Sequence, residues 1–185
     1  MTGESPTKGS GPRRSLLRLL HVVERVIEGS GAAIIFATLS FTFCALLVNV
    51  VLRYAFGSGL AWAYEIHAIL FPWLVAGGIA VASVRGWHIS VDALIGILPD
   101  AAKRAVALLV SVAILAIAVT VIRTSGPIIK ASQFQRLSEI PVSQYWGYIS
   151  LYYAFGAMAA QAVITLARQI LAPDYDRDLP QQSFS

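Results

Sequence analysis

The chain alternates long apolar runs with short polar segments, and the apolar runs set its predicted architecture. Four runs stand out, at 29–52, 66–84, 105–122 and 148–167. Each is near or above the length of about 20 residues at which an α-helix crosses the hydrocarbon core of a bilayer. A bilayer offers no water to backbone N–H and C=O groups, so each run is expected to pair them within a helix. The pattern predicts an all-α integral membrane protein with four transmembrane helices.

Residues 15–28 follow a different pattern, with Leu and Val at helical spacing on one side and Arg, His and Glu on the other. This predicts an amphipathic helix in the headgroup layer, separated from the first span by a flexible Gly29-Ser30-Gly31. Residues 1–12 and 171–185 are polar and are predicted to be disordered tails around a single membrane domain, 13–170. Pro12-Arg13-Arg14 resembles the start of a twin-arginine export signal, but Glu24 and Glu28 interrupt the apolar stretch that such a signal needs.

Composition supports a membrane location. The chain is 57% hydrophobic and 13% charged, with a mean hydropathy of +0.69, which is too apolar for a soluble domain of 185 residues. The single cysteine, Cys44, excludes an internal disulfide. The net charge of +4 comes from Lys and Arg beside the apolar runs, without the basic, aromatic-interleaved pattern that nucleic-acid binding requires.

The distribution of Lys and Arg predicts the orientation. Four spans place both termini on one side, and of the 14 Lys and Arg residues, four (Arg53, Arg123, Lys130 and Arg136) fall on the opposite side. Because cytoplasmic loops carry the excess of positive charge, we expect both termini to be cytoplasmic in a bacterial inner membrane.

The connecting segments carry their own signals. Ser90 is predicted to cap a short interfacial helix over 91–98, and Asp100 to cap the third span. Residues 123–146 are predicted to form an irregular loop with one helical turn. Pro72 is expected to kink the second span, and Gly77-Gly78 to offer a smooth patch for close helix contact.

Polar residues at one end of the first two spans form the first candidate site. Asn49 and Arg53 share a helix face, and Glu65 begins the second span after a short connection, so an Arg53–Glu65 ion pair is geometrically easy. Either this ion pair only stabilises the hairpin between the two spans, or one of its two residues contacts a partner protein. Trp62, Trp73 and Trp87 fit the aromatic belts of the two membrane interfaces.

A second candidate site lies at the other end of the second span. Arg85, His88 and Asp92 are spaced i, i+3, i+7, so a continuing helix places them on one face. Asp92 could orient His88 or pair with Arg85, which suits either a proton relay or a cluster that orders an interface.

Several chemistries are disfavoured by spacing. His67 and His88 lie roughly 31 Å apart along one helix axis and cannot share a haem iron. No Ser/His/Asp set, glycine-rich phosphate loop or paired carboxylate site appears, so we expect neither an enzyme nor a cofactor in this chain. No acidic residue falls in the middle of a span, whereas ion pathways through a membrane usually contain such residues, so an ion pathway within this chain is disfavoured.

The segment VVLRYAFGSGLAWAYEI, followed by FPWLVAGGIAVASVRGWHISVD, resembles the small membrane subunit (DctQ type) of tripartite ATP-independent periplasmic (TRAP) transporters. The shared pattern is R-Y at the end of span one, W-x-x-E before span two, W-L-V with glycines inside it, and then R-G-x-H-I-x-V-D. Ile140-Pro141 and Tyr148 extend the resemblance over about residues 15–170. Span four departs from it, because Leu151-Tyr152-Tyr153-Ala154 stands where the family commonly has a proline and a glycine.

The resemblance implies a role in uptake of organic acid anions. In such systems a soluble periplasmic protein captures the anion, and a large multi-span membrane subunit carries it with a sodium gradient by an elevator motion. Sodium ions are expected on that large subunit, while the small subunit acts as a stator among the membrane lipids. The alternative function is an independent small carrier working as a homo-oligomer. Such carriers place a carboxylate within span one, and residues 29–52 contain none.

Overall fold

The computed structural model describes residues 11–94 and 100–171, and the side chains of 18–86, 102 and 105–169. These residues form the helices α1 (Gly11–Phe56), α2 (Trp62–Glu65), α3 (His67–Leu94), α4 (Asp100–Thr124), α5 (Gly126–Ser132), α6 (Tyr145–Tyr148) and α7 (Ser150–Leu171). Helical hydrogen bonds continue from α2 into α3 across Ile66 and from α6 into α7 across Ile149.

Four helical stretches are long and apolar enough to cross a membrane: Arg18–Phe56, Trp62–Gly86, Ala105–Thr124 and Tyr145–Gln169. The prediction of an all-α membrane protein with four spans is therefore confirmed.

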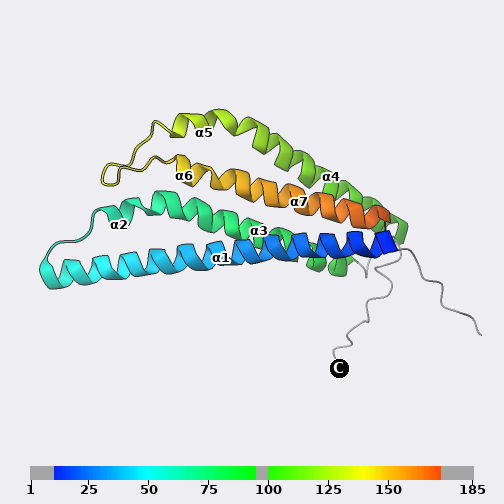
Figure 1. Cartoon of the computed structure of the whole chain (residues 1–185), viewed down its shortest axis with the longest axis horizontal. Helices are drawn as coiled ribbons and strands as arrows, with labels where there is room; N and C mark the ends of the chain where they lie inside the picture. The colour runs from blue at the N-terminus through cyan, green and yellow to red at the C-terminus, as the bar shows by residue number, and fades with distance from the viewer. Residues whose placement is uncertain (1–10, 95–99, 172–185) are drawn as a thin grey trace, which may run out of the picture.

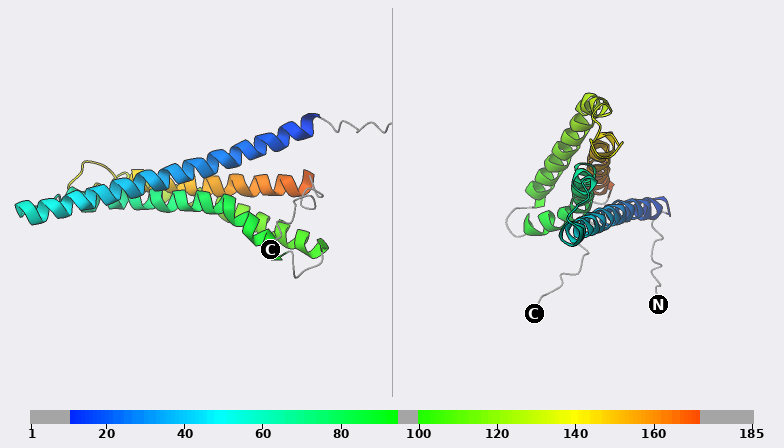
Figure 2. Two further views of the ribbon diagram at one scale, coloured as in Figure 1. Left: turned by 90° about the horizontal axis from the view of Figure 1, so that it is seen from below. Right: turned by 90° about the vertical axis from the view of Figure 1, so that its left-hand side faces the viewer.

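The four long helices stand side by side in a row, as Figure 1 and the end-on view in Figure 2 show. The principal packing contacts join α1 to α3, α3 to α7, and α7 to α4, so α1 and α4 form the two edges. We call the end with the segments 57–61 and 133–144 the hairpin end, and the opposite end, where α1 begins and α7 finishes, the terminal end.

Helix α1 is continuous through Gly29-Ser30-Gly31, so the predicted interruption between an amphipathic helix and the first span is wrong. Two of these residues, Ser30 and Gly31, pack against neighbouring helices. A Cβ on Gly31 would lie 2.9 Å from the carbonyl oxygen of Gly77 in α3, and the Ser30 hydroxyl lies 2.7 Å from the Tyr153 hydroxyl of α7. This close approach fixes α1 against its neighbours.

Helix α3 contains Pro72, which leaves the carbonyl of Ala68 without its helical N–H donor. That carbonyl faces Gly147 of α6, where a Cβ would come within 3.1 Å. A glycine at this position lets α6 approach the freed carbonyl. At its other end α3 runs through Ser90 to Leu94, so the separate helix predicted to start at Ser90 is wrong, and residues 95–99 lie outside the described part of the chain.

The segment between α4 and α7 is more ordered than an irregular loop. It contains α5, which begins at Gly126-Pro127, and an isolated antiparallel bridge between Arg136 and Ser143. The backbone N–H of Gln144 donates to Gln135 O at 2.9 Å, which closes a small hairpin beside α2.

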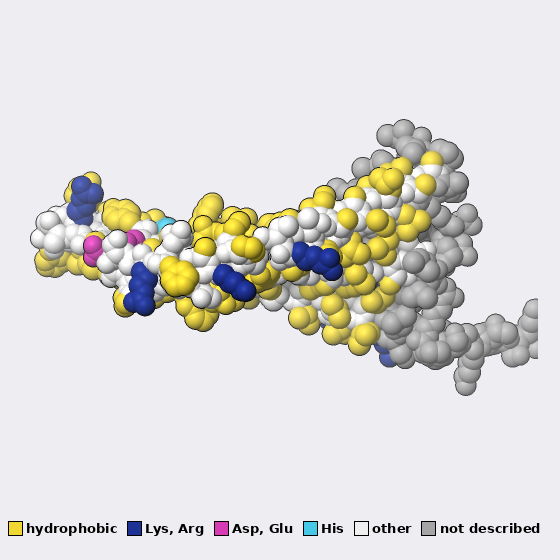
Figure 3. All heavy atoms as spheres, turned by 90° about the horizontal axis from the view of Figure 1, so that it is seen from above, with side chains coloured by type: hydrophobic (Ala, Val, Ile, Leu, Met, Phe, Trp, Pro, Cys, Tyr) yellow, Lys and Arg dark blue, Asp and Glu magenta, His cyan; other side chains and the backbone are white. Residues whose placement is uncertain are grey.

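Most apolar side chains of the described spans face outward, as expected for helices in lipid. Phe36, Phe43, Phe71 and Leu109 are all highly exposed, whereas many of the buried positions hold small residues such as Ala76, Ala80 and Ala118. Figure 3, seen from the side of α4 and α5, shows apolar side chains over much of the surface, with Lys and Arg spread from the hairpin end past the middle. The exposed apolar side chains of the spans are therefore open to lipid or to another protein.

Candidate functional sites at the two ends of the helix row

Asn49 organises the hairpin between α1 and α2. Its side chain is 1% exposed, and its Oδ1 accepts the backbone N–H of Leu60 at 2.5 Å. A Cβ on Gly59 would lie 2.8 Å from this oxygen, so a larger residue there would have to displace the Asn49 side chain. Gly57 supplies the turn, because its φ of 71° belongs to the left-handed region that favours glycine. The Asn49 side chain thus holds the loop 57–61 against α1.

Glu65 binds the loop between α5 and α6. One carboxylate oxygen accepts the backbone N–H of Ser138 and the other that of Glu139, each at 2.7 Å. Hydrogen bonds from two backbone N–H groups stabilise the ionised carboxylate and hold the loop against the start of α3. Glu65 therefore joins two segments that lie more than 70 residues apart in sequence.

Arg53 is exposed, and the predicted Arg53–Glu65 ion pair is wrong: within the described chain no hydrogen bond or ion pair reaches its side chain. The physical reason is competition, because the two N–H groups of the 133–144 loop occupy the Glu65 oxygens. Arg53 instead lines an open hollow of about 360 Å³ together with Asn49, Gly59 and Tyr64.

Trp73 and His67 lie on the same span as Glu65. The indole Nε1 of Trp73 donates to Trp146 O at 2.8 Å, and its ring stacks at a tilt on Tyr153, with centroids 5.9 Å apart. Trp73 thus joins α3 to α6 and α7, beyond the predicted belt role, whereas Trp62 is exposed as a belt residue would be. Both ring nitrogens of His67 are buried without a hydrogen-bond partner among the described groups.

A buried ion pair holds the terminal end together. Glu24 of α1 is 5% exposed, and its Oε2 lies 2.6 Å from Nη2 of Arg168 in α7. Its Oε1 accepts a hydrogen bond from Nε2 of Gln161 at 3.1 Å, and His21 Nδ1 lies 3.2 Å from Oε2. Helix α7 therefore covers this face of α1 at Glu24, and the predicted headgroup-layer location of residues 15–28 stays a prediction.

Arg85 pairs with Glu28 of α1, with Nε and Oε1 2.7 Å apart. This pair joins α1 to α3, as the Glu24–Arg168 pair joins α1 to α7. His88 and Asp92 belong to α3, but their side chains, like that of Trp87, lie outside the described part of the structure, so the predicted Arg85–His88–Asp92 cluster stays a prediction.

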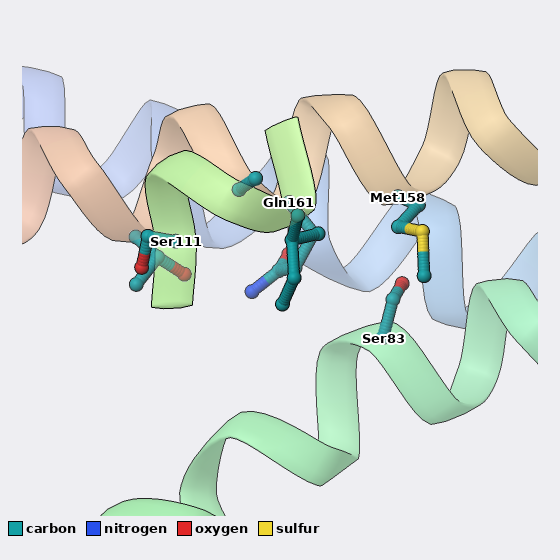
Figure 4. A pocket seen from close by; sticks show the side chains of 7 residues that line it. Ser83, Ser111, Met158 and Gln161 are labelled. Atoms are coloured by element: carbon teal, nitrogen blue, oxygen red, sulfur yellow. The ribbon is translucent and has the colours of Figure 1, made fainter. Parts of the chain in front are cut away.

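A small cavity of about 70 Å³ lies where α3, α4 and α7 meet. Figure 4 shows Gln161 of α7 at its centre, with Ser111 of α4 and Ser83 of α3 in the wall. Both hydroxyls donate to carbonyls of their own helices, at Ala107 and Ala80. The amide oxygen of Gln161 is buried without a partner among the described groups. The cavity is large enough for one or two water molecules and far too small for an organic substrate.

Sequence reasoning missed the Glu24–Gln161–Arg168 cluster and the loop contacts of Glu65. Gln161 and Arg168 are seven residues apart and so share a face of α7, and Glu24 and Glu28 share a face of α1. That signal marks two polar helix faces, but it does not say that they meet.

The described charged side chains lie at the two ends of the row and leave the middle of the spans apolar. Fold and sites together define a multi-pass membrane protein whose polar groups fasten helices and loops to one another.

Residues 42–172, more than half of the chain, match the family described as "Tripartite ATP-independent periplasmic transporters, DctQ component". The chain belongs to this family, which is a family of transporter components, and the resemblance inferred from the motifs is confirmed.

Parts of the chain are also similar to two curated proteins. The chain is 31% identical over 98 residues to the C4-dicarboxylate TRAP transporter small permease protein DctQ of Vibrio cholerae, a match covering 51% of this chain and 42% of that protein. It is 32% identical over 97 residues to an uncharacterized protein of Sinorhizobium fredii, a match covering 50% of this chain and 17% of that protein. The chain thus spans less than half the length of either relative. No solved structure matches it.

Proposed function

We propose that this chain is the small scaffold subunit of a sodium-gradient-driven TRAP transporter that imports organic acid anions. In this proposal a periplasmic binding protein delivers the anion, and a large multi-span membrane subunit carries both the anion and the sodium ions. This chain stays fixed and widens the stationary part of the complex. A C4-dicarboxylate, named for the Vibrio cholerae relative, is one anion of this class.

The observation that carries the proposal is the open row of helices in a chain of the DctQ family. A row exposes broad apolar faces that a second membrane protein can cover, and the described spans hold no charged side chain near their middle. Intramembrane charges usually mark ion and substrate pathways, so their confinement to the two ends favours a supporting role.

The charge distribution supports cytoplasmic termini in a bacterial inner membrane. The described Lys and Arg side chains of the hairpin end are the four that the sequence places on the side opposite the termini: Arg53, Arg123, Lys130 and Arg136. In the proposed orientation the terminal end, with Arg85 and Arg168, faces the cytoplasm, and the hairpin end faces the periplasm.

Uptake by proteoliposomes tests the function. Vesicles should contain the large subunit alone, this chain alone, or both, with the binding protein and a labelled organic acid outside under a sodium gradient. We expect uptake only with both membrane chains present and only with sodium. Sodium-driven uptake by this chain alone would overturn the scaffold role and favour an independent carrier.

A further inference from the structure

Arg53 has no counter-charge within the described chain. Its side chain is exposed, and the neighbouring acid, Glu65, already accepts the N–H groups of Ser138 and Glu139. Arg53 lies three residues before the end of the candidate span Arg18–Phe56, at the membrane edge, where a neighbouring subunit can supply an opposite charge. A group outside this chain is therefore the natural source of the compensating negative charge.

The surroundings of Arg53 form a preformed hollow. It measures about 360 Å³ and is lined by Arg53 together with Asn49, Gly57, Gly59, Leu60, Ala61 and Tyr64. The Asn49–Leu60 hydrogen bond fixes the loop that builds one wall, independently of the Arg53 side chain. Removing the Arg53 charge should thus leave the shape of the hollow unchanged.

Tyr64 lines this hollow, and two further exposed aromatic residues, Tyr54 and Phe56, lie close to Arg53 in the sequence. Tyr54 is 86% exposed, Phe56 75%, and Tyr64 58%. Arg, Tyr and Trp are the residue types most enriched among those that contribute most of the binding free energy in protein interfaces. The planar guanidinium accommodates a carboxylate with two parallel hydrogen bonds.

The number of cations distinguishes a protein carboxylate from a lipid headgroup. Sequence segments that recognise anionic lipids usually carry clusters of several Lys or Arg. Arg53 is the only cation in the lining of this hollow, and it matches the single negative charge of one Asp or Glu side chain.

We propose that the Arg53 hollow receives an Asp or Glu side chain of the large membrane subunit, with Arg53 as its ion-pair partner. The inference rests on the proposed function, because it needs the large subunit as the partner.

The test uses the complete transporter in native membranes, solubilised in a mild detergent. Arg53→Gln removes the charge, and Arg123→Gln is the matched control, since Arg123 is also exposed without a partner among the described residues but does not line the hollow. We expect Arg53→Gln to weaken association with the large subunit at least about tenfold and Arg123→Gln to leave it unchanged. Equal recovery of the large subunit with Arg53→Gln and wild type would overturn the inference.

A photo-crosslinking amino acid in place of Tyr64 identifies the occupant directly. The expected product joins this position to a segment of the large subunit that contains Asp or Glu. A product with phospholipid alone, or with a segment lacking an acid, would overturn the inference. Wild-type chain that recovers no large subunit at all would instead refute the proposed function, so the two failures are distinguishable.

Discussion

Gly31 of α1 and Gly77 of α3 lie against each other's backbone. A Cβ on Gly31 would lie 2.9 Å from Gly77 O, and a Cβ on Gly77 would lie 2.8 Å from Gly31 O. Neither contact could be relieved by rotating a side chain, because the opposing atoms belong to the backbone. This crossing sets the distance between the first two spans.

We therefore expect Gly77→Ala to destabilise the chain by about 1–3 kcal/mol, as overpacking does elsewhere. Gly78→Ala is the control, because nothing lies within 4 Å of the position that its Cβ would take. Thermal unfolding in detergent should show a lower melting temperature for Gly77→Ala alone. Equal melting temperatures for the two variants would refute the close crossing of α1 and α3.

The Glu24–Arg168 pair provides a second prediction. Arg168→Gln leaves a carboxylate that is 5% exposed without its cation, and breaking a buried pair in this way costs about 3 kcal/mol. The double variant Glu24→Gln with Arg168→Gln removes both charges and should recover part of that loss. Melting temperatures of the three proteins check this, and a double variant less stable than Arg168→Gln would contradict it.

The loop contact of Glu65 predicts a local change in dynamics. Glu65→Ala removes the acceptors of the Ser138 and Glu139 N–H groups, so hydrogen exchange at these two amides should become faster. Exchange in the middle of α7 should stay unchanged. Glu139→Ala is the control, since the side chain of Glu139 is exposed and takes no part in these two contacts. Unaltered exchange at Ser138 in Glu65→Ala would show that the contact does not order the loop.

Asn49 predicts a cost at the first hairpin. Asn49→Leu leaves the Leu60 N–H without its acceptor and should lower stability by about 1–3 kcal/mol. Thr38→Val is a matched control on the same helix, because the Thr38 hydroxyl donates only to carbonyls of its own helix, those of Ile34 and Ile35. Chemical or thermal unfolding of both variants tests this, and a stability loss of equal size in both would count against a special role for Asn49.

The number and position of the spans could be predicted from the sequence, because hydropathy over about 20 residues is a local property. Gly77 could also be predicted as a packing glycine, although the sequence did not distinguish it from the free Gly78. The choice of partner for each polar group could not be predicted in the same way. Arg53 and Glu65 are near in sequence and opposite in charge, yet Glu65 binds backbone groups more than 70 residues away.

The same limit explains the misread N-terminal part of α1. Glu24 and Glu28 looked like the polar face of a surface helix, since their partners Arg168 and Arg85 lie 144 and 57 residues further along the chain. Gly29-Ser30-Gly31 looked like a break, since glycine disfavours helix. Packing against α3 and α7 outweighs that preference, and only the tertiary structure reveals it.

The central claim is that this chain supports a large membrane subunit and does not act alone. Purification from native membranes in a mild detergent, followed by mass spectrometry of the intact complex, tests it most directly. The account predicts one copy of this chain bound to one large multi-span TRAP subunit. Recovery of this chain only as a monomer or homo-oligomer, from membranes that contain the large subunit, would contradict it.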